Sequence, residues 1–199
     1  MADLFNTPTH LQLPDSDILY YPNFLSYEEA NVHYKSLKKN ISWQQDDITV
    51  FGKTYPQPRL TALYANNTRP YSYSNITMHP TLFTEELDLI KKKVEQVANV
   101  NFTTCLLNLY RSGQDSNGWH ADNEKELGRN PVIASLSLGA ERYFHLRHNT
   151  IKEAKHKMVL EHGSLLLMQG ETQHFWKHQI AKTKKQIGER INLTFRIIK

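Results

Sequence analysis

The stretch RINLTFRII at residues 190–198 alternates polar and apolar side chains with a period of two. An extended strand places alternate residues on opposite faces, so the apolar residues of this stretch form one core-facing side. The other face carries four polar side chains, Arg190, Asn192, Thr194 and Arg196. No carboxylate stands on the strand beside the two guanidinium groups, and their paired N–H groups suit a carboxylate or phosphate ligand. The alternative is that both arginines pair with Asp or Glu elsewhere.

The sequence around this strand is typical of a β domain. Short segments rich in β-branched, aromatic and leucine residues are separated by Gly, Asn and Asp turns, without a helical period among them. We expect further strands near 103–110, 132–138, 142–147, 157–160, 164–168 and 174–177. Many short strands in one half of a chain predict a β-sandwich or jelly roll.

The first half of the chain contains two helical patterns. Ser26 followed by Glu29 forms a capping box, and the apolar spacing after it predicts a helix over 27–39. A second apolar pattern over 83–97 lies behind Pro80, which suits a first-turn position, and predicts another helix.

Residues 46–74, between these helices, are rich in Tyr, Thr, Asn and Pro and predict hairpins, with strands near 48–51 and 60–64. We therefore expect a mostly β protein with an α+β front end, in which residues 1–199 form one domain. Residues 1–100 would supply the N-terminal helix and hairpins, and residues 101–199 the jelly-roll core, a double-stranded β-helix.

The composition excludes some classes of protein. The 199 residues are 39% hydrophobic and 22% charged, which is ordinary for a globular domain. No apolar run approaches the ~18 residues of a spanning helix, and residues 1–20 lack the apolar segment of a secretory signal. We expect no membrane association and no secretion, and a location in the cytoplasm of a bacterium or the nucleus of a eukaryote. The single cysteine, Cys105, stands in the apolar stretch TTCLLNLY and predicts a buried thiol in a reducing compartment.

The positive charge is concentrated in the second half of the chain. Residues 1–100 contain 9 Lys and Arg against 11 Asp and Glu, whereas residues 101–199 contain 15 against 9. The excess forms two clusters, Arg142, Arg147, Lys152, Lys155 and Lys157, and then Lys177, Lys182, Lys184 and Lys185. A solvated basic face is one interpretation, and a polyanionic partner such as nucleic acid is the other.

A candidate metal site begins at His120-Ala121-Asp122. With ten His and twenty Asp and Glu in the chain, one such triplet is expected by chance, so its position matters more than its presence. It follows the polar turn 112–118 after a predicted strand, where residues two apart project to one side. An iron site of the two-His, one-carboxylate type needs one more histidine. The candidates for it are His162, His174 and His178.

Asn108 and Tyr110 are also two apart on a predicted strand and add neutral donors on one face. Together with the polar face of 190–196 they could line a slot for a small dicarboxylate beside a metal. For each histidine taken singly, the alternative is an ordinary structural side chain.

This combination resembles the AlkB-type iron(II)- and 2-oxoglutarate-dependent dioxygenases, which demethylate nucleic-acid bases. The matching pieces arrive in family order over residues 48–199. They are Asn108-x-Tyr110, Trp119-His120-x-Asp122, PVIASLSLG at 131–139, HGSL at 162–165, His178, and Arg190-x-Asn192-x-Thr194-x-Arg196. By this resemblance His120, Asp122 and His178 hold Fe(II). The resemblance assigns 2-oxoglutarate to Asn108, Tyr110, Arg190, Asn192 and Arg196.

The front end resembles the branch of this family that repairs duplex DNA, in which a hairpin lid recognises the nucleotide. The resemblance implies substrate contacts at Phe51, Gly52, Lys53, Arg59, Tyr71, Tyr73, Ser74, Asn123 and Glu124. Phe51 would fill the gap left by a flipped base, unless it folds back on the core, and Tyr73 and His120 would sandwich that base. Close relatives carry an acidic residue where this chain has Asn123, which bears on base selectivity.

The resemblance implies direct reversal of alkylation damage. Fe(II) would be the cofactor and 2-oxoglutarate and O2 the co-substrates for demethylation of 1-methyladenine and 3-methylcytosine in DNA, with RNA as a second substrate. We expect the chain to act as a monomer. One alternative is an Fe(II)/2-oxoglutarate hydroxylase or demethylase acting on RNA, protein or a small molecule. Another is a metal-free jelly-roll module that binds nucleic acid.

Overall fold

The computed structural model describes residues 7–50, 52–73 and 76–199. Within these residues two sheets face each other and enclose a core, as the predicted jelly roll requires. The larger sheet has eight strands in the order β1-β2-β14-β11-β16-β9-β5-β8, and the smaller has four in the order β10-β15-β12-β13. All neighbouring strands are antiparallel except β5 and β8.

The larger sheet contains β1 (Thr9–His10), β2 (Asp17–Tyr21), β5 (Leu60–Ala65), β8 (Thr81–Leu82), β9 (Thr104–Tyr110), β11 (Ile133–Gly139), β14 (Leu165–Gln169) and β16 (Arg190–Arg196). The smaller contains β10 (Asn117–His120), β12 (Arg142–His148), β13 (Lys155–Leu160) and β15 (Trp176–Ile180). The helices are α1 (Tyr27–Asn40), α2 (Glu85–Ala98), the short α3 (Thr172–Phe175) and a 3-10 turn at Lys125–Leu127. Among these described helices, none is long and apolar enough to cross a membrane.

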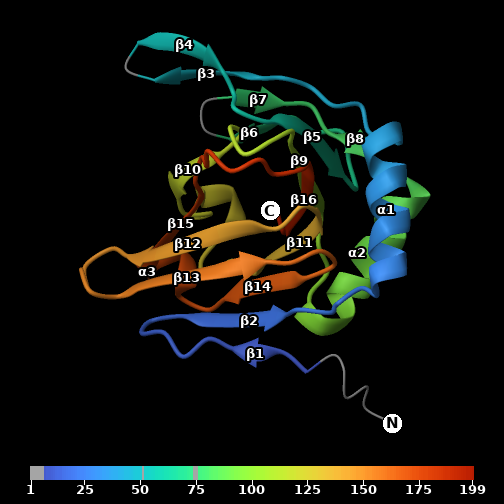
Figure 1. The fold of residues 1–199 in the computed structure, drawn as a ribbon. Helices are drawn as coiled ribbons and strands as arrows, with labels where there is room; N and C mark the ends of the chain where they lie inside the picture. Colours follow the sequence, from blue (N-terminus) through green and yellow to red (C-terminus); the bar gives the residue numbers. More distant parts are fainter. Residues whose placement is uncertain (1–6, 51, 74–75) are drawn as a thin grey trace.

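Strand β16 lies between β9 and β11 near the middle of the larger sheet. Its apolar residues Ile191, Leu193 and Phe195 are fully buried in a core that α1 and α2 close from the outside, on the right in Figure 1. Its polar residues are buried as well, because they face the smaller sheet across the interior. The predicted period of two is thus confirmed, and the polar face lines an internal pocket.

Both long helices form where the sequence predicts them, with one difference at the start of α2. Ser26 and Glu29 complete the capping box of α1. The N-cap of α2 is Thr84, whose hydroxyl accepts from the backbone N–H of Leu87. The expectation that Pro80 lies in the first turn of α2 is therefore wrong. The chain after Pro80 instead enters β8, which pairs with β5 before the helix begins.

The strand predicted at 174–177 is displaced. His174 lies in the one-turn helix α3, and the strand begins at Trp176, which is buried between the sheets. Buried and more exposed residues alternate from Trp176 to Ile180. Because α3 ends in an apolar residue directly before this strand, the sequence pattern alone does not show where the helix ends and the strand begins. Strands β2 and β10 were not expected. The sequence NGWH of β10 carries few β-forming residues, whereas DILYY of β2 is rich in them and was overlooked.

Two hairpins project from the sheet at the top of Figure 1. The first pairs β3 (Asp47–Val50) with β4 (Lys53–Pro56), and the second pairs β6 (Tyr71–Tyr73) with β7 (Ile76–Met78). A hairpin within 46–74 is confirmed by β3 and β4, whereas the second hairpin extends to Met78 and the strand expected at 60–64 is β5 of the larger sheet. Phe51, the predicted wedge, lies outside them.

Candidate metal centre and co-substrate pocket

Three candidate ligands converge at the pocket between the sheets. His120 ends β10, Asp122 follows it by two residues, and His178 lies opposite His120 in the antiparallel pair of β10 and β15. One ligand atom from each lies within 4.8 Å of the others. The pairing of β10 with β15 therefore brings His178, from a segment remote in sequence, next to the two candidate ligands His120 and Asp122.

Hydrogen bonds fix the tautomer of His120. Its Nδ1 lies 2.7 Å from the carbonyl oxygen of Gly118, which can only accept, so Nδ1 carries the proton. The lone pair is then on Nε2, which receives a hydrogen bond from the side-chain amide of Asn117 at 3.2 Å. A neutral imidazole with a backbone carbonyl behind its N–H is the arrangement that orients a metal ligand.

The protonation states of the other two ligands also suit a metal. Burial, reinforced by His120, lowers the pKa of His178 to about 3, so the ring is neutral. Burial alone would raise the pKa of Asp122. The positive charge of Arg196, together with the two neighbouring histidines, outweighs burial, and the pKa lies below its usual value. Two neutral imidazoles and one carboxylate form the donor set of non-haem Fe(II) oxygenases. These residues fit the expected iron.

The other two histidines proposed from the sequence lie elsewhere. Nδ1 of His162 accepts from the backbone N–H of Gly139, and its ring contacts Tyr27. His174 is exposed and bonds to Asn130. Of the three candidates, His178 alone lies beside His120 and Asp122.

The polar face of β16 contains a buried cation that is incompletely bonded. Arg190 is 1% exposed and donates through Nη2 to the hydroxyl of Ser137 at 2.8 Å. Its Nε and Nη1 have no hydrogen-bond partner among the described residues. Burial lowers the pKa of this guanidinium to about 10, although Tyr110 opposes the shift. Two unsatisfied N–H donors on a buried cation are what one carboxylate of 2-oxoglutarate would occupy.

Arg196 has a different environment from Arg190. Its Nη2 lies 2.7 Å from a carboxylate oxygen of Asp122, and both side chains are buried. Arg196 thus pairs with a carboxylate of the protein, whereas Arg190 forms no ion pair among the described residues. Asn192 is held by the hydroxyls of Ser135 and Thr194.

Two serines of the site were missed: Ser135, which lines the pocket, and Ser137, which binds Arg190. Both stand on β11 opposite the polar face of β16 and bond to Asn192 and Arg190 respectively. The alternation of serine with leucine at 135–138 was the available signal, because a polar period of two inside a buried strand indicates a lined cavity.

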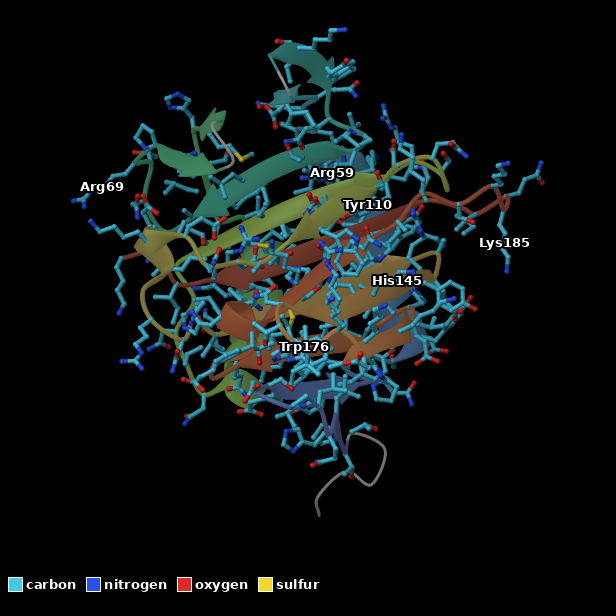
Figure 2. All side chains as sticks on the ribbon, turned by 90° about the vertical axis from the view of Figure 1, so that its left-hand side faces the viewer. Arg59, Arg69, Tyr110, His145, Trp176 and Lys185 are labelled. Atoms are coloured by element: carbon cyan, nitrogen blue, oxygen red, sulfur yellow. The ribbon has the colours of Figure 1, made fainter. Side chains whose placement is uncertain are left out.

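The residues expected to contact substrate lie in several different environments. Arg59 is 5% exposed and donates to the side-chain oxygen of Asn108 at 2.7 Å, so it supports the pocket from inside (Figure 2). Gly52 and Lys53 are exposed on the first hairpin. Asn123 is exposed, and burial raises the pKa of the neighbouring Glu124. The structure does not describe Phe51 and Ser74, or the side chains of Tyr71 and Tyr73.

One member of the basic clusters is not available to a partner. Arg142 is 3% exposed and donates to the backbone carbonyls of Ser112, Asp115 and Ala181. The expectation that Arg142 belongs to an outer basic surface is therefore wrong, because it ties three chain segments together. The other members of both clusters are exposed.

A family model described as the 2OG-Fe(II) oxygenase superfamily matches residues 17–196. The alpha-ketoglutarate-dependent dioxygenase alkB homolog 3 of Mus musculus is 40% identical over 192 residues, covering 92% of this chain and 66% of that protein. The DNA oxidative demethylase ALKBH2 of Arabidopsis thaliana is 36% identical over 214 residues, covering 92% and 67%. The chain thus spans about two thirds of the length of these relatives. The solved structure of OsALKBH1 matches with a TM-score of 0.67 over 96% of this chain and 99% of that one, at 18% identity, which shows a common fold.

Proposed function

The chain belongs to the 2OG-Fe(II) oxygenase superfamily, and from that membership we propose that it oxidatively demethylates N-alkylated bases in nucleic acid. The proposed substrates are 1-methyladenine and 3-methylcytosine in DNA, with RNA as a second substrate, and residues 1–199 act as a single catalytic domain. One observation carries the proposal: three metal-type ligands and an incompletely bonded arginine share one buried pocket. The names of the relatives, a dioxygenase and a DNA oxidative demethylase, support the substrate class.

The residues of the pocket would have two roles, binding the metal and binding 2-oxoglutarate. His120, Asp122 and His178 would hold Fe(II), and the carbonyl of Gly118 would orient the ring of His120, whose Nε2 would exchange the amide of Asn117 for the metal. The polar face of β16 would hold 2-oxoglutarate, with Arg190 binding one carboxylate. When bound, iron and 2-oxoglutarate supply oxidation of the N-methyl group by O2, which releases succinate, CO2 and finally formaldehyde.

The 2-oxoglutarate pocket would be completed by Asn108 and Tyr110 of β9 and by Asn192 of β16. Leu106, Phe144 and Met168 form the apolar side of this pocket and exclude water. The three converging ligands and the superfamily match both argue against the metal-free binding module considered from the sequence.

The direct test is an incubation of the chain with Fe(II), ascorbate, 2-oxoglutarate and methylated oligonucleotides, single-stranded and duplex. We expect loss of the methyl group from both modified bases, identified by mass spectrometry, together with succinate. Iron-dependent succinate without any demethylated base would instead support a hydroxylase acting on another substrate.

The resemblance of the front end to the branch that repairs duplex DNA is tested at Phe51. Phe51→Ala should lower activity on a methylated duplex about tenfold, with little change on the same sequence as a single strand, because only a duplex leaves a gap for the ring. Stacking on an aromatic ring is worth ~1–3 kcal/mol per base. Both activities are measured at one salt concentration. Equal losses on the two substrates would assign Phe51 to the pocket or the fold.

A further inference from the structure

The smaller sheet has two faces with different chemistry. Its inner face carries His120, His178 and Phe144, which line the pocket. Alternation places the neighbouring residues of each strand on the outer face. These are Trp119 on β10, Lys177 and Gln179 on β15, Tyr143, His145 and Arg147 on β12, and Lys155, Lys157 and Val159 on β13. One sheet therefore separates the proposed active site from this outer face.

The outer face is basic, without compensating acids on its strands. All residues of β10, β12, β13 and β15 are described, and none of them is Asp or Glu. Arg147, Lys155, Lys157 and Lys177 are exposed, and none forms an ion pair with a described residue. Such a surface attracts a polyanion.

Aromatic rings are interleaved with these cations. Tyr143 is 47% exposed, and Nζ of Lys157 lies 3.8 Å from its ring centroid. The guanidinium of Arg147 lies 4.3 Å from the ring centroid of Trp119. Each of the two rings therefore lies next to a cation of the outer face.

A groove of about 480 Å³ lies at one end of this face. Tyr143, His145 and Lys157 form its sheet side, and Lys182 and Lys185 of the following loop form its other side. Figure 2 shows Lys185 projecting from that loop at the right, with His145 on the neighbouring strand. The groove falls within the range of ~300–1,000 Å³ that is usual for small-ligand pockets. Its lining includes one acidic residue, the exposed Glu141.

We propose that this outer face is a second nucleic-acid contact surface, which binds a single-stranded segment with an unpaired base against Tyr143. Lys157 and Lys182 contact the flanking phosphates. A single strand exposes the faces of its bases, whereas a duplex hides them, so exposed rings among cations favour the single strand. An acidic peptide would engage the lysines but would gain nothing from the ring. The proposal rests on the proposed function only in taking nucleic acid as the substrate class.

The test measures binding of a fluorescein-labelled, unmodified oligothymidylate of about 16 nucleotides by fluorescence anisotropy, so no turnover is needed. Tyr143→Ala should weaken binding about tenfold, and Tyr143→Phe should retain it, because stacking does not use the hydroxyl. The double variant Lys157→Ala/Lys182→Ala should reduce the salt slope of log K by about 1.4, the value for two phosphates on a single strand.

The matched control is Lys35→Ala/Lys39→Ala, which removes the same charge from exposed positions on α1 and should bind as the wild type does. If Tyr143→Ala binds the oligothymidylate like the wild type, the proposal is overturned, as it is if polyaspartate loses as much affinity as the oligothymidylate on this change. If the wild type fails to demethylate methylated oligonucleotides and the Tyr143 and lysine effects are still found, the proposed function fails and the second surface stands.

Discussion

Replacing Asp122 with Ala is expected to lower demethylation by at least about a hundredfold, which is ~2.7 kcal/mol of barrier. Asp122 is the single anionic member of the proposed ligand set, and two neutral imidazoles hold a dication weakly. The measurement is initial rate at saturating Fe(II) and 2-oxoglutarate, below the melting temperature of the variant. Retention of about one tenth of the wild-type rate or more would contradict the ligand assignment.

The same substitution should also destabilise the protein before any metal is added. Asp122 and Arg196 form a buried ion pair, and removing one partner of such a pair costs ~3–5 kcal/mol. At ~2–4 °C per kcal/mol for a chain of this size, the melting temperature should fall by on the order of 10 °C. Asp122→Asn is the matched variant, because its amide oxygen can still accept from Arg196. It should melt closer to the wild type and still lack activity, which separates the metal from the fold.

The metal ligands show how far a local pattern reaches. His120 and Asp122 could be paired from the sequence, because residues two apart on extended backbone point the same way. Three histidines remained equivalent as the third ligand when judged from the residues alone. The register of β10 against β15, which depends on contacts far apart in the chain, places His178 there. The family resemblance also indicates His178, because the motifs of a family include residues that are far apart in the chain but adjacent in the fold.

The arginines of β16 show the opposite limit. Their alternation correctly predicted that Arg190 and Arg196 share a face, and the buried positions of Ile191 and Leu193 confirm the core side. The alternation could not indicate that Arg196 lies against Asp122 while Arg190 meets Ser137. Those partners come from neighbouring strands and from the loop after β10, and no spacing within β16 encodes them.

Charge clusters were the least informative part of the sequence. Arg142 and Arg147 are five residues apart and looked alike, but strand alternation sends one into the interior and the other outward. The buried member donates to three backbone carbonyls, and the exposed one stacks on Trp119. A basic run therefore predicts a basic surface only after the faces of its strand are assigned.

Arg190→Met is expected to abolish stabilisation by 2-oxoglutarate without lowering the melting temperature of the ligand-free protein. The wild type carries this guanidinium fully buried, with Nε and Nη1 unpartnered in the described part of the chain, and each unsatisfied buried donor costs ~1–3 kcal/mol. An apolar chain of similar length removes that cost. A ligand at about one hundred times its Kd stabilises the wild type by ~2.7 kcal/mol, and the variant should lose most of this gain.

Arg142→Met is the matched control, because Arg142 is similarly buried and its guanidinium also lies near the ring of Tyr110, but it donates to three backbone carbonyls. That substitution removes three hydrogen bonds to backbone carbonyls, so it should lower the melting temperature while the shift produced by 2-oxoglutarate stays near the wild-type value. Both variants are compared by thermal melting with Fe(II) under anaerobic conditions, with and without 2-oxoglutarate. If Arg190→Met melts as low as Arg142→Met and keeps the ligand shift, Arg190 is a structural cation. The carboxylate contact then belongs to Arg196, which would have to exchange Asp122 for the ligand.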